Sequence, residues 1–270
     1  MTPASTDQTF RTRVLGGTGL RVGRLGVSAS YGVPARAVEQ AFERGVNYLY
    51  WGSRRTGGFG QAIRNLSPQR DRMVLVVQSY SRIAALVGPS LERALREVKL
   101  DYADVLLLGL WNKPVAERIV EAARKQKDRG LVRFLALSSH DRPMLGQLAA
   151  ARTFDVLHFR YNAIHPGAES DIFPHIPAEN RPGMVAYTAT SWKQLLSSRK
   201  LPAGEKVPSA ADCYRFVLSR PEVDVCMTGP SNAAQMEEAL RRSTKVPCPK
   251  PSLPGCGVSA PRNTADYFRT

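Results

Sequence analysis

A short segment of the chain brings together a phenol and two guanidinium groups that could act on a reacting oxygen atom. Tyr50 is followed within five positions by the basic pair Arg54 and Arg55. The pKa of a tyrosine is about 10 and a neighbouring cation lowers it, so Tyr50 is a candidate proton donor. Arg55 keeps its own proton at ordinary pH, so it could bind an oxyanion or a carboxylate without protonating it.

Several other kinds of site are excluded by the residue patterns. No part of the sequence matches a Ser-His-Asp triad, a pair of glycosidase carboxylates or an H-E-x-x-H helix. The cysteines form no C-x-x-C pair and no zinc-type cluster, so we expect no metal and interpret Cys213 and Cys226 as buried thiols. The Gly-Gly-Thr-Gly run at 16–19 lacks the Lys-Ser/Thr of a phosphate loop and predicts the turn of a small hairpin.

The composition is that of a globular protein. Of the 270 residues, 43% are hydrophobic and 23% are charged, which excludes a globally disordered or fibrous chain. No apolar run approaches the roughly 20 residues needed to span a bilayer, and residues 1–13 show no secretory signal, so we expect a cytoplasmic protein. The net charge of +15 is scattered and the longest basic runs are pairs, so we expect a small-molecule ligand rather than nucleic acid.

Short apolar runs predict eight strands. They are Leu25–Ser28, Val46–Leu49, Val74–Gln78, Asp104–Leu108, Arg133–Leu137, Asp155–Phe159, Gly183–Tyr187 and Asp224–Met227. Because most of these runs are apolar throughout rather than alternating, they are typical of parallel strands covered on both faces.

Amphipathic stretches between these runs predict the helices that cover the sheet. Val38, Ala41 and Phe42 show the i, i+3, i+4 spacing, and similar stripes follow later in the chain. Eight β/α units in about 250 residues favour a closed (β/α)8 TIM barrel. An open doubly wound sheet is the alternative, but its usual G-x-G-x-x-G turn is missing. We predict a barrel over residues 1–242 and an irregular Pro/Gly-rich tail over residues 243–270.

Several segments resemble the aldo-keto reductases, in the same order, over roughly residues 13–241. "RVLGGTGLRVGRLGVS" is similar to the family's opening hairpin and first strand, and "ERGVNYLYWGSRR" to the segment with its catalytic Asp and Tyr. "SLERALREVKLDYADVLLLG", "DRGLVRFLALSSH" and "GMVAYTAT" resemble later parts of the family. The resemblance implies a (β/α)8 barrel that binds NADP(H) along the carboxyl ends of its strands.

The family's catalytic tetrad is replaced at all four positions. The resemblance puts Tyr50 at the position of the Asp, Arg55 at the Tyr, Gln78 at the Lys and Gly109 at the His. In the family the tyrosine protonates the oxyanion left by hydride transfer, and the lysine lowers the tyrosine's pKa. Gln78 has no charge and Gly109 has no side chain, so Tyr50 either takes over as the acid or fills the space that the tetrad left.

The positions that the resemblance assigns to nicotinamide cofactor binding match the family better than the tetrad positions do. The resemblance implies that Ser138, Ser139 and His158 hold the carboxamide, and that Tyr187, followed by Thr188, stacks on the nicotinamide. The positions that grip the adenine and its 2′-phosphate are Gly229, Ser231, Gln235 and Glu238. No arginine or lysine stands there to pair with a 2′-phosphate, so the sequence leaves both NADP and NAD open.

Other polar and aromatic residues follow the predicted strands. Trp111 and Trp192 come after the fourth and seventh strands, where they either line a pocket or cover its rim. Arg160 follows the sixth strand and either points into the pocket or pairs with Glu169. Two functions remain open: an oxidoreductase of aldo-keto reductase type with altered chemistry, or an inactive relative that serves as a cofactor sensor or partner-binding scaffold.

Overall fold

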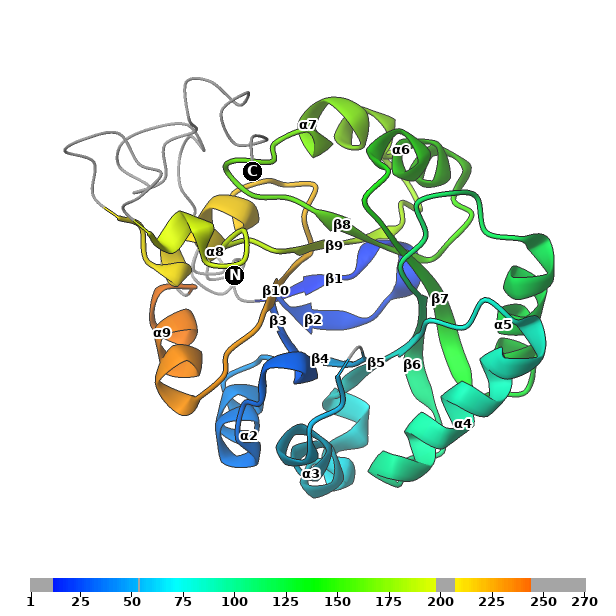
Figure 1. Ribbon diagram of the computed structural model, residues 1–270, viewed down its shortest axis with the longest axis horizontal. Coiled ribbons are helices and arrows are strands. Elements are labelled where there is room, and N and C mark those ends of the chain that lie inside the picture. Colours follow the sequence, from blue (N-terminus) through cyan, green and yellow to red (C-terminus); the bar gives the residue numbers. More distant parts are fainter. Residues whose placement is uncertain (1–11, 53, 198–206, 244–270) are drawn as a thin grey trace, which may run out of the picture.

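The computed structural model describes residues 12–52, 54–197 and 207–243, and these form a closed barrel of parallel strands. The strand order around the barrel is β10-β3-β4-β5-β6-β7-β8-β9, and helices surround the strands (Figure 1). The predicted (β/α)8 barrel is therefore confirmed. Most of the predicted tail, residues 244–270, lies outside the described residues.

The barrel strands lie close to their predicted positions. Their bounds are β3 (Leu25–Ser28), β4 (Tyr48–Trp51), β5 (Val74–Ser79), β6 (Ala103–Leu108), β7 (Val132–Ser139), β8 (Val156–Arg160), β9 (Gly183–Tyr187) and β10 (Val225–Thr228). The largest shift is in β4, which begins two residues later than predicted. The reason is Asn47, whose side chain accepts a hydrogen bond from Gly23 N and donates to the carbonyls of Arg21 and Arg72.

The helices lie outside the strands. They are α2 (Ala35–Glu43), α3 (Gly57–Asn65), α4 (Val87–Val98), α5 (Glu117–Asp128), α6 (Arg142–Ala151), α7 (Ala168–Asp171), α8 (Ala210–Leu218) and α9 (Ala233–Ser243). Apolar stripes predicted most of them, but α3 begins with two glycines and buries mainly Phe59 and Ile63. Within the described ranges, none of the helices has the length and apolar character needed to cross a membrane. Cys213 and Cys226 are free and buried, as predicted.

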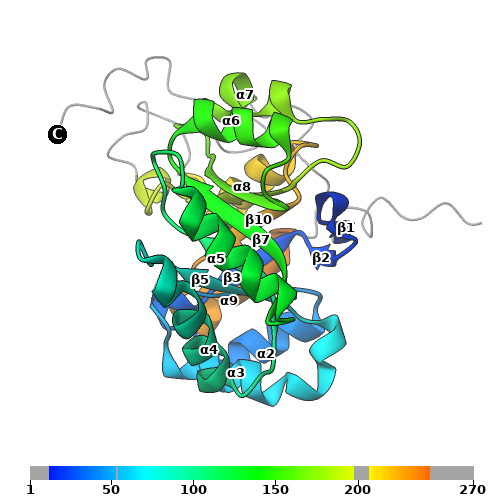
Figure 2. The ribbon, with the colours of Figure 1, turned by 90° about the vertical axis from the view of Figure 1, so that its right-hand side faces the viewer.

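A small antiparallel hairpin closes the amino-terminal end of the barrel. Strands β1 (Thr12–Val14) and β2 (Arg21–Gly23) pair with each other, and Figure 2 shows them beyond one end of the barrel. Leu15 and Leu20 are buried in the barrel interior beside Val156. Gly16 has a positive φ and lies so close to Pro182 and Gly183 that a Cβ would meet the Gly183 nitrogen at 2.3 Å. The opposite end of the barrel is left open.

Inward-facing positions change from apolar to polar along the strands. Alternate residues of a strand face the same side. The lower interior therefore contains apolar side chains such as Val76 and Val156. The next inward positions toward the carboxyl ends are Gln78 on β5 and His158 on β8. A parallel barrel places its functional residues at this end.

Candidate functional site

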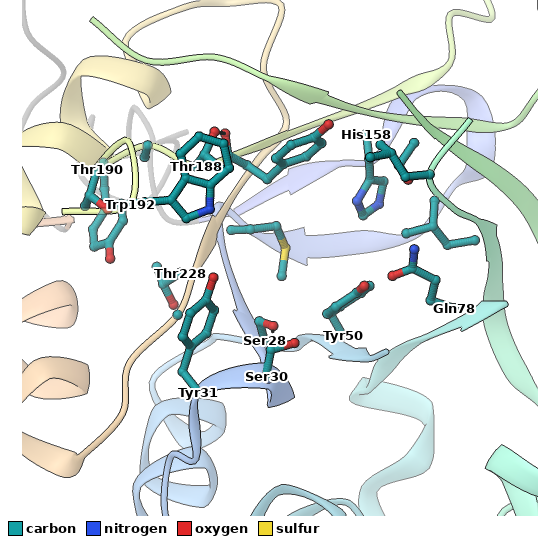
Figure 3. A pocket seen from close by; sticks show the side chains of 18 of the residues that line it. Ser28, Ser30, Tyr31, Tyr50, Gln78, His158, Thr188, Thr190, Trp192 and Thr228 are labelled. Atoms are coloured by element: carbon teal, nitrogen blue, oxygen red, sulfur yellow. Dashed lines mark hydrogen bonds between the residues drawn. The ribbon is translucent and has the colours of Figure 1, made fainter. Parts of the chain in front are cut away.

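A cavity opens at the carboxyl ends of the barrel strands (Figure 3). Its volume is about 520 Å³, a size that suits a small molecule. Tyr50, Gln78 and His158 line its inner part, and the segments after β3, β9 and β10 complete its walls. In Figure 3, Tyr31 and Tyr50 approach the cavity from one side and Trp192 from the other.

Much of the cavity wall is aromatic. The aromatic lining residues are Tyr31, Tyr50, Tyr80, Tyr187, Trp192 and Tyr214. The sequence pointed to Tyr50, Tyr187 and Trp192 but not to the others. Tyr31 and Tyr80 follow the ends of β3 and β5 closely, and this position could have revealed them. Tyr214 lies within the packing stripe of α8 and gives no such signal.

Tyr50 lies in the cavity, folded back against its own chain. A Cβ on Gly52 would be 2.5 Å from Cζ of Tyr50 and 2.7 Å from its hydroxyl. Position 52 therefore has to be glycine for the phenol to take this place. The same Cβ would lie 2.8 Å from Cβ of Gln78, so Tyr50 and Gln78 share a tightly filled corner.

Gln78 occupies the space that a side chain at position 109 would need. A Cβ on Gly109 would lie 1.7 Å from Nε2 of Gln78 and 2.9 Å from Oγ of Ser138. Gln78 is 5% exposed, so its amide is enclosed at the cavity floor. Gln78 and Gly109, two positions that the resemblance assigns to the tetrad, therefore fit each other: the long neutral side chain on β5 fills the space beside Gly109 after β6.

This fit predicts the effect of a methyl group at position 109. We expect Gly109→Ala to lower the free energy of unfolding by about 1–3 kcal/mol, because Gln78 must leave a filled site. Urea unfolding measures the change. In a Gln78→Ala background the same substitution should cost little. Gly57→Ala is the control, since a Cβ there meets nothing within 4 Å. Equal stability of Gly109→Ala and the unmodified protein would contradict the proposed crowding.

Arg55 lies outside the cavity lining. Its guanidinium forms an ion pair of 3.7 Å with Glu97 on α4 and a hydrogen bond of 3.4 Å with the Gln78 carbonyl. It also stacks on the ring of Trp51, 5.9 Å from the centroid. The structure thus places Arg55 between the barrel and its helices. Trp111 is also absent from the lining, and Arg82 covers its ring at 3.8 Å.

His158 is buried and bonded to the barrel interior. Its Nε2 is 2.8 Å from the hydroxyl of Tyr48, which is fully buried one inward layer below the cavity. Burial lowers the pKa of His158 to about 3, so the imidazole is neutral at ordinary pH. Burial also raises the pKa of Tyr48 well above its usual range. The pair is therefore a neutral hydrogen-bonded unit at the cavity floor.

Most of the predicted cofactor positions meet in this cavity. Those that line it are Ser138, His158, Tyr187, Thr188, Gly229, Ser231 and Gln235. Ser139 and Glu238 do not. Ser139 is fully buried, its hydroxyl accepts from Asp141 N, and its carbonyl accepts from the Tyr187 hydroxyl. Ser139 thus fixes the ring of Tyr187 instead of facing the cavity.

The segment before α9 satisfies part of its own hydrogen-bonding capacity. Ser231 N and Ser231 Oγ both donate to Oε1 of Gln235, at 2.8 and 2.9 Å. Gln235 N donates to Oδ1 of Asn232 at 2.9 Å. A helix N-terminus can bind phosphate through free N–H groups. A phosphate bound here would compete with Gln235 for the nitrogen of Ser231.

Several solved structures with a similar fold are described as aldo-keto reductases. An aldo-keto reductase from Bacillus halodurans, in its holo form, has a TM-score of 0.72 and 21% identity, covering 88% of this chain and 92% of its own. Two structures from Pseudomonas aeruginosa, both described as aldo-keto reductases, have TM-scores of 0.64 and 0.62 with 19% and 22% identity. Each covers 86% of this chain and 94% of its own. The chain has the aldo-keto reductase fold. No protein-family model matches the sequence, and no curated protein does so either.

The nicotinamide cofactor that the aldo-keto reductase fold implies can be tested against these residues. The hydroxyl of Ser138 and the neutral imidazole of His158 face one cavity, beside the fixed ring of Tyr187. Hydrogen-bonding groups next to a flat ring suit a planar carboxamide. Lys193 also lines the cavity and supplies a cation for a phosphate. The residues present therefore fit the nicotinamide end well, while the phosphate end requires Gln235 to give way.

Proposed function

We propose that the chain binds a nicotinamide nucleotide, NADP(H) or NAD(H), at the carboxyl end of its barrel and does not reduce carbonyl compounds by the aldo-keto reductase mechanism. The observation that carries this proposal is the crowding of Gln78 against Gly109. The region that would hold a proton relay is filled by a neutral amide. Binding at this site without turnover matches a cofactor sensor or a scaffold.

The binding residues have distinct roles in this proposal. A bound nicotinamide nucleotide supplies a hydride donor or acceptor. Ser138 and His158 would hold its carboxamide, Tyr187 would pack on its ring, and Lys193 would face its phosphates. Tyr187 is suited to this because its hydroxyl, 2.8 Å from the Ser139 carbonyl, holds the ring in place before any ligand arrives.

Proton supply separates a binding protein from a reductase. A carbonyl that accepts a hydride becomes an oxyanion and needs a proton, for which a placed acid contributes roughly 10²–10⁴ in rate. Arg55 is turned toward Glu97, and Gln78 has no charge with which to lower the pKa of a phenol. The packing of Tyr50 against Gly52 supports the role of filling space.

Nucleotide binding is the first test. We expect NADPH or NADH to quench tryptophan fluorescence in a saturable manner, with a dissociation constant in the micromolar range, about 1–100 μM. Tyr187→Ala should weaken binding about tenfold or more because the stacking surface is lost. Tyr187→Phe keeps the ring but loses the hydrogen bond to Ser139, so it should weaken binding less than Tyr187→Ala does, and Arg124→Gln on α5 is a surface control. Absence of binding at about 1 mM of either nucleotide would overturn the proposal.

Turnover tests the second half of the proposal. We expect no oxidation of NADPH or NADH above background with benzaldehyde or butanal, for the unmodified protein and for Tyr50→Phe alike. The measurement is the absorbance of the reduced nucleotide over hours. Steady turnover that Tyr50→Phe abolishes would instead identify Tyr50 as the acid and the protein as an oxidoreductase of altered chemistry.

A further inference from the structure

A guanidinium group stands behind the cavity wall on the inward side of β8. Arg160 is the last residue of this strand, and Val156 and His158 precede it at alternate positions. Val156 belongs to the barrel interior and His158 lines the cavity. Because alternate residues of a strand share a face, the side chain of Arg160 leaves β8 on this same inward face. It also pairs in register with Tyr187 on β9, another lining residue.

Two lining residues hold the guanidinium in place. Nη2 of Arg160 is 3.2 Å from Nδ1 of His140, and the guanidinium carbon is 4.8 Å from the ring centroid of Trp192. His140 and Trp192 both line the cavity, and Trp192 is 54% exposed. Nε of Arg160 is buried and has no hydrogen-bond partner among the described residues. The guanidinium of Arg160 is therefore held in one orientation, while its Nε–H lacks a hydrogen-bond acceptor among the described residues.

No carboxylate of the described residues pairs with Arg160. Glu169, the partner that the sequence offered as an alternative, instead accepts from the Tyr161 hydroxyl at 2.6 Å and pairs with Arg220. Asp171 is engaged by Arg142 at 2.7 Å. Both acidic groups of the α7 segment are thus committed to other cations. Arg160 remains a half-buried positive charge without a negative partner in the described part of the chain.

The histidines near Arg160 are held neutral, so the positive charge here comes from Arg160 itself. Burial lowers the pKa of His140, and Arg160 lowers it further by repulsion. Burial also lowers the pKa of His165, and Arg160, Arg142 and His140 add to the effect. Lys193, which follows Trp192 in the chain, also lines the cavity. An anion is the ligand that Arg160 and Lys193 favour, and a guanidinium matches a carboxylate with two parallel hydrogen bonds.

We propose that His140, which lines the cavity, and Arg160 directly behind it form an anion-binding end, and that the cavity accepts a planar, largely apolar ligand with a carboxylate group. The aromatic walls give the apolar part of such a ligand its contact surface, with Tyr80 and Trp192 among them. Arg160 then supplies the charge for the carboxylate. This inference goes beyond nucleotide binding and does not depend on it.

A matched pair of probes tests the proposal on the protein without nucleotide. The anion 2-naphthoate and the neutral 2-naphthamide have the same shape, and isothermal titration calorimetry gives the dissociation constant of each. We expect the naphthoate to bind about tenfold more tightly, because its carboxylate forms a charge-assisted ion pair with the guanidinium, whereas the amide offers the same cation only a neutral acceptor. Equal affinities, or no binding of either probe, would overturn the proposal whether or not NADPH binds.

Variants assign the preference to Arg160. Arg160→Gln should bring the naphthoate affinity down to that of the naphthamide, while the naphthamide affinity changes by less than about twofold. Arg160→Lys keeps a charge without the planar fork and should retain part of the preference. Arg124→Gln removes an exposed charge on α5 and should change neither affinity. A preference that survives in Arg160→Gln, with a native circular dichroism spectrum, would place the anion elsewhere.

Discussion

Replacement of Asp224 by alanine is expected to lower the free energy of unfolding by about 3–5 kcal/mol. Asp224 is fully buried at the amino-terminal end of the barrel. Its carboxylate pairs with Arg13 at 2.9 Å and with Arg181 at 3.0 Å, and it accepts a hydrogen bond from Met184 N at 2.9 Å. Removal of this one group leaves two partly buried cations and one backbone donor without their partner.

Urea unfolding measures this loss of stability. Two further variants separate the contribution of the buried charge from that of an ordinary surface ion pair. Asp224→Asn keeps an acceptor for Met184 N but not the charge, so it should cost less than the alanine variant. Glu117→Ala breaks an exposed ion pair with Arg124 on α5 and should cost less than about 1 kcal/mol. A loss below about 1 kcal/mol for Asp224→Ala would show that the buried cluster does not hold this end of the barrel together.

Acidification from pH 7 to pH 5 is expected to cost the unmodified protein about 2 kcal/mol of unfolding free energy through His158 alone. The folded pKa of His158 is about 3, and its unfolded pKa is about 6.5. Because the folded pKa is the lower one, the unfolded chain takes up a proton first. Stability therefore falls as the pH drops below about 6.5 and continues to fall until about pH 3.

His158→Gln separates this effect from other titrations. Glutamine cannot titrate and can still form a hydrogen bond with Tyr48. The pKa values of His140 and His165 are also lowered, but these groups are present in both proteins. The difference in pH dependence between the two proteins thus reports His158. His175→Gln, at an exposed histidine, is the control, and equal pH slopes in all three proteins would contradict the burial of a neutral imidazole.

The sequence by itself determined the architecture. Apolar runs alternating with amphipathic stretches have few stable arrangements, and a parallel sheet needs helices to cover it. The inward side of β5 and β8, which carries Gln78 and His158, was seen only in the closed barrel. The hairpin around Gly16 and Gly17 was found where the turn residues indicated it. Helix α3 was missed because its glycine-rich start hides a short apolar stripe.

Only the tertiary structure decided how the replaced residues fit together. Gln78 and Gly109 are far apart in the sequence. The side chain of Gln78 fills the space beside Gly109 only because β5 and β6 lie next to each other in the barrel. The direction of Arg55 was set by Glu97 on α4, and that of Arg160 by His140 and Trp192. A local pattern determines which residues reach the carboxyl end of a barrel. Which of them face the cavity, and which are held by partners from distant segments, depends on packing between elements that no short pattern contains.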